Sequence, residues 1–181
     1  MSNNNRLTEV QARVLAALKG DINFCDPDNY GVHVLHEACR LGKDDLVTNI
    51  LLNPLVDVNL QNSDAATPFH DACSMAKDKA TSQLLKDSRV ALNVVNKHGH
   101  SPLFVAAQNG SMGVLQWLIA SGRDFGDIEN PFMFRDGKEY TAAGIAKRER
   151  KSAAVALLEA FAEDPTKTRK ECREKLAIPG N

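Results

Sequence analysis

Five histidines and four cysteines are the residues of this sequence that could bind a metal ion. Zinc and copper prefer imidazole and thiolate ligands at close spacing. His98 and His100 flank Gly99 and could act together with His33, but no third ligand at a suitable spacing lies within the same segment. We therefore expect no metal site. The alternative is a protein of a different functional class, a metal-dependent protein or enzyme that uses His98 and His100.

The cysteines do not occur at the C-x-x-C spacing of metal sites: they are Cys25, Cys39, Cys73 and Cys172. A chain of this size inside a cell does not need disulfides to stabilise its core. We therefore interpret these cysteines as reduced and structural. A redox-active Cys25 or Cys172 is the alternative.

Motifs for catalysis are also absent from the sequence. It contains no Gly-rich phosphate loop, no G-x-S-x-G turn, no H-E-x-x-H helix and no paired carboxylates in a recognisable setting. We therefore predict a protein that is not an enzyme and needs no cofactor.

The composition is typical of a soluble globular protein, with 43% hydrophobic and 25% charged residues among 181. The 22 basic and 23 acidic residues leave a formal net charge of -1, so no overall field attracts nucleic acid or a membrane. The longest apolar stretch, residues 153–158, is too short to cross a bilayer, and the first residues lack a signal-peptide pattern. We expect a monomer in the cytoplasm, with the nucleus as an alternative, and a protein partner rather than nucleic acid or a membrane.

The last third of the chain is locally basic, at residues 147–151 and 167–175. A solvated helix face explains such runs. An acidic partner surface, a nuclear-localisation signal and nucleic-acid binding are the alternatives, in that order.

A 34-residue repeat organises the chain. The segment 35–39 recurs at 69–73 and again at 103–107, and the unusual pair His36 and His70 keeps the same step. Each unit carries two short apolar-periodic segments that cannot bury both faces alone. Helix pairs must therefore stack on one another, and contacts should be local in sequence.

These units resemble the ankyrin repeat, and residues 96–107 match its pattern most fully. The resemblance implies that His36 and His70 hydrogen-bond neighbouring turns together. The second unit lacks both glycines of the pattern and carries Ala65 and Ala76 in their places. We therefore expect its turns to be distorted.

The resemblance implies an all-α ankyrin-repeat solenoid of about four helix-turn-helix repeats with β-turn fingers and a capping helix at each end. The expected boundaries are a disordered N-terminus at 1–6, a repeat domain at 7–161 with a cap at 7–27 and repeats at 28–61, 62–95, 96–127 and 136–161, an inserted loop at 126–137, and a C-terminal capping helix and tail at 162–181. An apolar stripe of Thr168, Cys172 and Leu176 should pack the last helix on repeat four. Cys39 and Cys73 occupy equivalent positions and should lie too far apart for a disulfide.

The resemblance also implies that a partner protein binds the concave groove formed by the turn tips and the first helix of each repeat. Carried over by position, the residues expected to face the partner are Tyr30, Val32, Arg40, Leu41, Asp64, Met75, Lys97, His98, His100, Gln108, Asn109, Lys138, Tyr140 and Arg148, with Asn29, Ser63, Ala66, Ser74 and Glu149 beside them. We expect an apolar anchor of the partner near Tyr30 and Leu41 and acidic groups toward Arg148. A regulator that inhibits an enzyme or a transcription factor by covering its surface is the alternative.

The connection between repeats three and four is longer than the short turn of the family. Long loops in compact arrays are usually functional or disordered. Its apolar residues Phe132, Met133 and Phe134 either fold back over the core or project as a partner contact, in which case Phe132 and Phe134 join the binding residues.

Overall fold

The computed structural model describes residues 20–23, 25 and 30–178. The disordered N-terminus expected at 1–6, nearly all of the cap expected at 7–27, and Asn29 lie outside these residues. In chain order the elements are α2 (Val34–Leu41), α3 (Asp44–Leu51), α4 (Pro68–Ser74), α5 (Asp78–Lys86), α6 (Pro102–Asn109), α7 (Met112–Ser121), β1 (Phe132–Met133), β2 (Glu139–Tyr140), α8 (Ala142–Arg148), α9 (Ser152–Glu163) and α10 (Pro165–Lys175).

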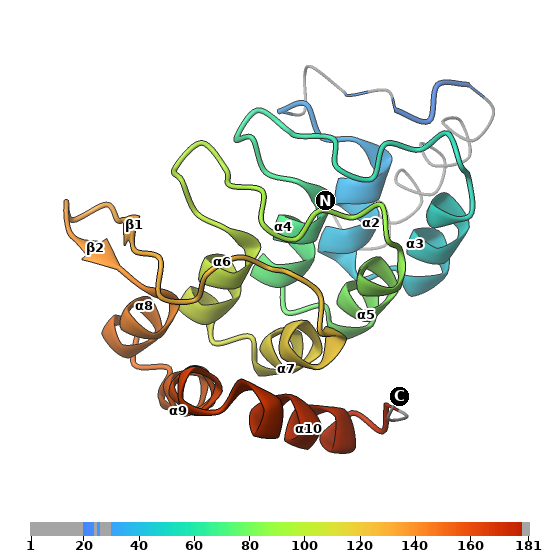
Figure 1. The fold of residues 1–181 in the computed structure, drawn as a ribbon. Helices are drawn as coiled ribbons and strands as arrows, with labels where there is room; N and C mark the ends of the chain where they lie inside the picture. Colours follow the sequence, from blue (N-terminus) through green and yellow to red (C-terminus); the bar gives the residue numbers. More distant parts are fainter. Residues whose placement is uncertain (1–19, 24, 26–29, 179–181) are drawn as a thin grey trace, which may run out of the picture.

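Successive helix pairs stack side by side and form two rows (Figure 1). In the first row α2 packs on α4, α4 on α6 and α6 on α8, while in the second row α3 packs on α5, α5 on α7 and α7 on α9. The turn that precedes each first-row helix projects from the stack, and we call these turns the fingers. The expected all-α solenoid is confirmed.

Polar N-caps begin the first-row helices. The hydroxyls of Ser101 and Thr141 accept hydrogen bonds from the backbone N–H of residues 104 and 144. In the first repeat His33 takes this position, and its Nδ1 accepts from Leu35 N at 3.1 Å. These side chains satisfy donors that the first turn of a helix leaves unpaired, and they thereby fix where each finger ends.

The turns of the second repeat are not distorted. Ala65 and Ala76 have φ values of 53° and 50°, close to 77° at Gly99 and 69° at Gly110. Both alanines therefore adopt the left-handed backbone of the glycines they replace, at a cost of about 1 kcal/mol each. The expectation of distortion was wrong, because stacking against the neighbouring repeats holds the turn shape despite this strain.

Two arginines join the second row of helices. Arg89 donates to the carbonyls of Leu51, Asn53 and Pro54, which follow the end of α3. Arg123 lies 34 residues later and donates to the carbonyls beyond α5, including that of Asp87 at 3.0 Å. Each guanidinium thus satisfies carbonyls at a helix C-terminus of the preceding repeat.

A continuous core runs along the stack and includes the small pairs Ala38–Cys39, Ala72–Cys73 and Ala106–Ala107, all fully buried. All four cysteines are free thiols. Burial raises the pKa of the Cys73 thiol far above its usual range. Among the described helices, none is long and apolar enough to cross a membrane.

The C-terminal helix α10 packs on both α7 and α9. Its expected contacts Thr168 and Cys172 are buried. Arg169 and Arg173 donate to the carbonyls of Ile119 and Ala120 at the end of α7, at 3.2 and 2.9 Å. The helix therefore bridges repeats three and four, whereas the sequence suggested packing on repeat four alone.

The inserted segment forms an antiparallel hairpin in which Phe132 pairs with Tyr140 and Met133 with Glu139. Phe134 is only 8% exposed and belongs to the core, whereas Met133 is 55% exposed. Phe132 is half-buried and meets the ring of Phe104 edge to face. The sequence left two outcomes open for these residues. Phe134 folds back over the core, whereas Met133 projects from the surface.

Candidate binding groove

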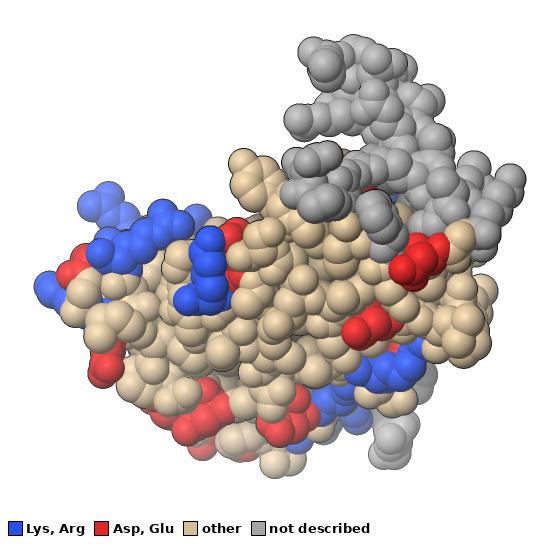
Figure 2. All heavy atoms as spheres, turned by 90° about the horizontal axis from the view of Figure 1, so that it is seen from above, with Lys and Arg blue, Asp and Glu red and all other residues tan. Residues whose placement is uncertain are grey.

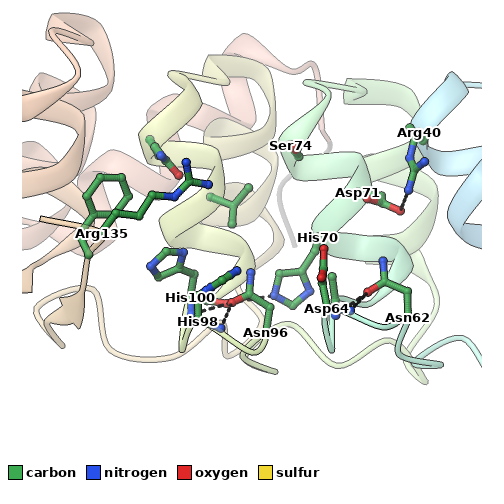
Figure 3. A pocket seen from close by; sticks show the side chains of 14 residues that line it. Arg40, Asn62, Asp64, His70, Asp71, Ser74, Asn96, His98, His100 and Arg135 are labelled. Carbon is green, nitrogen blue, oxygen red and sulfur yellow. Dashed lines mark hydrogen bonds and ion pairs between the residues drawn. The ribbon is translucent and has the colours of Figure 1, made fainter. Parts of the chain in front are cut away.

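The fingers are held beside one another by main-chain hydrogen bonds. Ser63 N donates to Tyr30 O, and 34 residues later Lys97 N donates to Asp64 O, both at 2.8 Å. Within each finger an asparagine shapes the turn: Asn62 Oδ1 accepts from two backbone N–H groups, and Asn96 Oδ1 does the same (Figure 3). Successive fingers therefore have the same backbone shape.

Histidines tie the first-row helices to the fingers. His36 Nε2 hydrogen-bonds Ala66 O at 2.9 Å, and His70 Nε2 hydrogen-bonds His100 O at 3.1 Å. The role that the resemblance implied for His36 and His70 is confirmed. Burial lowers the pKa of each ring to about 4, although these hydrogen bonds act in the opposite direction. Both rings are therefore neutral at pH 7.

A third bond of this kind holds the hairpin. His100 Nε2 meets Met133 O at 3.1 Å, and the His100 ring stacks on the rings of both Phe104 and Phe134. Burial lowers the pKa of His100, the hydrogen bond to Met133 opposes this change, and the charges of His98 and Arg135 add to it. The inserted segment is thus attached to the third finger.

A groove of about 310 Å³ lies between the fingers and the first-row helices (Figure 3). It is lined by Arg40, Asn62, Asp64, Ala66, His70, Asp71, Ser74, Asn96, His98, His100, Val105, Gln108, Phe134 and Arg135. These residues come from α2, α4, α6, two fingers and the hairpin, so the groove crosses three repeats.

The most buried carboxylate of the groove is that of Asp71 in α4. Its Oδ2 lies 3.4 Å from Arg40 Nη2 of α2. Burial raises the pKa of Asp71 to about 6, although the Arg40 charge and hydrogen bond act to lower it. Asp64, at the second finger, pairs with Lys97 of the third. The two acidic groups of the groove are thus both balanced by neighbouring cations.

Eight of the residues expected from the sequence line the groove: Arg40, Asp64, Ala66, Ser74, His98, His100, Gln108 and Phe134. Three of the expected residues offer little surface to a partner, since Val32, His100 and Phe134 are 5%, 7% and 8% exposed. Ala66 is buried as well. Residues 32, 66 and 100 occupy one repeat position, just before the helix N-cap, where the chain turns the side chain toward the core.

The remaining expected residues lie outside this groove. Tyr30 and Met75 are exposed, at 77% and 47%, and Leu41 is half-buried against the core. The others are Lys97, Asn109, Phe132, Lys138, Tyr140 and Arg148. Asn109 Nδ2 donates to Ser74 O at 3.3 Å and so borders the groove.

Arg148 braces the hairpin. Its guanidinium lies 4.7 Å from the centre of the Phe134 ring, and its Nε donates to Asp136 Oδ2 at 3.2 Å. It also pairs with Glu149. Because both acidic neighbours and an aromatic ring already engage this cation, the expected attraction of acidic partner groups toward Arg148 is weakened.

Several groove residues were missed by the sequence analysis: Asn62, Asp71, Asn96, Val105 and Arg135. The 34-residue step between Asn62 and Asn96 was a visible signal for the fingers. Arg135 had no such signal, because the longer connection shifts this finger out of the 34-residue step.

In the described part of the chain, no group of three or more His, Cys, Asp or Glu residues is arranged to hold a metal ion. The rings of His98 and His100 are 5.9 Å apart, and His100 already hydrogen-bonds the hairpin.

Comparison with known proteins gives one result. A family model described as ankyrin repeats (3 copies) matches residues 35–130. No curated protein sequence matches the chain.

Proposed function

The chain belongs to the ankyrin-repeat family, and on that premise we propose that it is a non-enzymatic module that binds a partner protein in the groove described above. Ankyrin repeats are in general protein-protein interaction modules. Partner recognition by the whole stack would use side chains contributed by several repeats at once.

One observation carries this proposal: the positions that hold the fingers repeat in kind, but the position of the first-row helices that faces the groove does not. Asparagine recurs at 62 and 96 to shape the fingers, and histidine recurs at 36 and 70 to tie them to the helices. By contrast, the groove positions 40, 74 and 108 share one place in the repeat and carry Arg, Ser and Gln. A constant backbone with varied side chains favours specific binding over a purely structural role.

The groove also favours binding over catalysis. Its buried carboxylate, that of Asp71, forms an ion pair with Arg40 and does not stand free beside a nucleophile. The groove is wide and runs across three repeats, whereas catalysis usually needs a closed and dry pocket.

A blocked groove tests the proposal. The double variant Ser74→Trp and Gln108→Trp fills the groove, and Asn49→Trp on the exposed face of α3 is the matched control. A partner captured from the native cell extract should be recovered by the unsubstituted chain and by the control, and lost with the double variant. Circular dichroism verifies that all three proteins are folded. Equal recovery by all three would place the binding surface elsewhere.

A further inference from the structure

The inserted hairpin contributes a cation to the end of the groove. Arg135 follows Phe134 at the end of β1, and its side chain lines the groove beside His100 (Figure 3). The groove-lining residues outside the hairpin belong to three repeats that follow the 34-residue step. The hairpin is the finger that precedes α8, and the main-chain hydrogen bonds at its tip match those of the third finger, so Arg135 takes the place that Lys97 has there.

Several contacts fix the turn that carries Arg135. Phe134 N donates to Lys138 O at 2.8 Å, and Gly137 N donates to Phe134 O at 2.9 Å. The Phe134 ring stacks on His100, 5.9 Å between centres, and lies under the guanidinium of Arg148. A cation on such a base keeps its position, so less conformational entropy is lost when it binds a charged group.

The charges around the groove single out Arg135. Arg40 pairs with Asp71, and Lys97 at the groove edge pairs with Asp64. Among the described residues that line the groove, Arg135 is the cation without an ion-pair partner. Figure 2, viewed from above the fingers, shows Lys and Arg gathered over the end of the molecule that carries the hairpin, while much of the remaining face is uncharged.

We propose that Arg135 binds an aspartate or glutamate side chain of the partner segment and thereby selects partners with an acidic residue at the hairpin end of the groove. This inference rests on the proposed binding function. It transfers the acid-recognition role from Arg148, whose charge is engaged within the hairpin, to a residue whose planar guanidinium is free to form a bidentate pair with a carboxylate.

A protein carboxylate fits this site better than a nucleic acid. Binding of a phosphate backbone uses several cations along a track. Here a single unpaired cation stands at one end, and the carboxylates of Asp64 and Asp71 line the rest of the groove, where they would repel a polyanion.

The test uses a phage-displayed library of short peptides, selected in parallel on the unsubstituted chain, on Arg135→Glu and on the control Lys147→Glu. Lys147 is an exposed cation on α8 that does not line the groove. We expect an acidic residue at one fixed position in peptides selected on the unsubstituted chain and the control, and a basic residue there with Arg135→Glu. A synthetic peptide from the first set should lose about tenfold in affinity when its acidic residue becomes Gln.

Two results would overturn the inference. One is an acidic preference that is absent or unchanged by Arg135→Glu, and the other is binding of a single-stranded oligonucleotide that Arg135→Glu abolishes. If the selected peptides nevertheless fail to bind the Ser74→Trp and Gln108→Trp variant, the groove still binds protein segments and only the role of Arg135 is refuted. If they bind that variant normally, the proposed function fails as well.

Discussion

Acidification from pH 6.5 to pH 4 should destabilise the fold, because His36 and His70 are buried in their neutral form. Burial lowers the pKa of each ring from 6.5 to about 4, so the unfolded chain takes up these two protons first. Their contribution to stability is complete above pH 6.5 and is lost as the pH falls toward 4. Each ring should lower the free energy of unfolding by roughly 3 kcal/mol over this range.

Asp71 opposes this trend. Its pKa rises from 3.8 to about 6 on folding, so its contribution to stability is complete below pH 3.8 and is lost as the pH rises through 6. Between pH 6 and pH 4 it should return roughly 3 kcal/mol, which leaves a net loss of about 3 kcal/mol. Burial also lowers the pKa of His33 and His100, which adds to the loss.

This effect can be measured by urea unfolding, followed by circular dichroism at a series of pH values between about 4.5 and about 7. The slope of the unfolding free energy with pH should fall by about 1.4 kcal/mol per pH unit in His70→Gln. It should steepen by a similar amount in Asp71→Asn, since the opposing proton is then absent. Unchanged slopes in both variants would refute the buried, neutral state of the histidines as the cause.

Three further predictions concern stability. Ala76→Gly should raise the free energy of unfolding by about 1 kcal/mol, measured in urea, because it relieves a left-handed alanine. Gly113→Ala should lower the melting temperature, since a Cβ there would overlap the Asp78 carboxylate, and Asp78→Ala should restore it. Arg123→Met should cost about 2 kcal/mol, because it removes the hydrogen bonds to the carbonyls of Leu85 and Asp87 at the end of α5, and an unchanged melting temperature would contradict this.

The stack could be predicted from the sequence because its framework repeats in residue type as well as in spacing. His36 and His70 make the same hydrogen bond one repeat apart, so their recurrence reported a real structural constraint. Arg89 and Arg123 also lie 34 residues apart, each just after a second-row helix, and join the second-row helices, but charged residues at such places are usually solvated, so their spacing alone does not predict this role.

The errors have local physical causes. Glycine is the usual residue in a left-handed turn, but alanine adopts it at Ala65 and Ala76 because the penalty is small beside the area buried in stacking. Val32 was expected outward from its place near a finger tip, whereas the extended backbone before the N-cap turns alternate side chains inward. The hairpin could not be predicted at all, since a two-residue strand pair has too few residues for a periodic signal.

The same division between framework and groove positions has a functional consequence. A substitution at Asn62 removes the hydrogen bonds that shape one finger, and a substitution at His70 removes a bond that joins two repeats, so either should change stability before it changes affinity. Among the described residues, the Gln108 and Arg135 side chains form no hydrogen bond that ties one repeat to another, so a substitution at either should change affinity at constant stability. Partner choice can therefore vary along this stack without loss of the fold, and the hairpin extends that freedom beyond what the repeats alone provide.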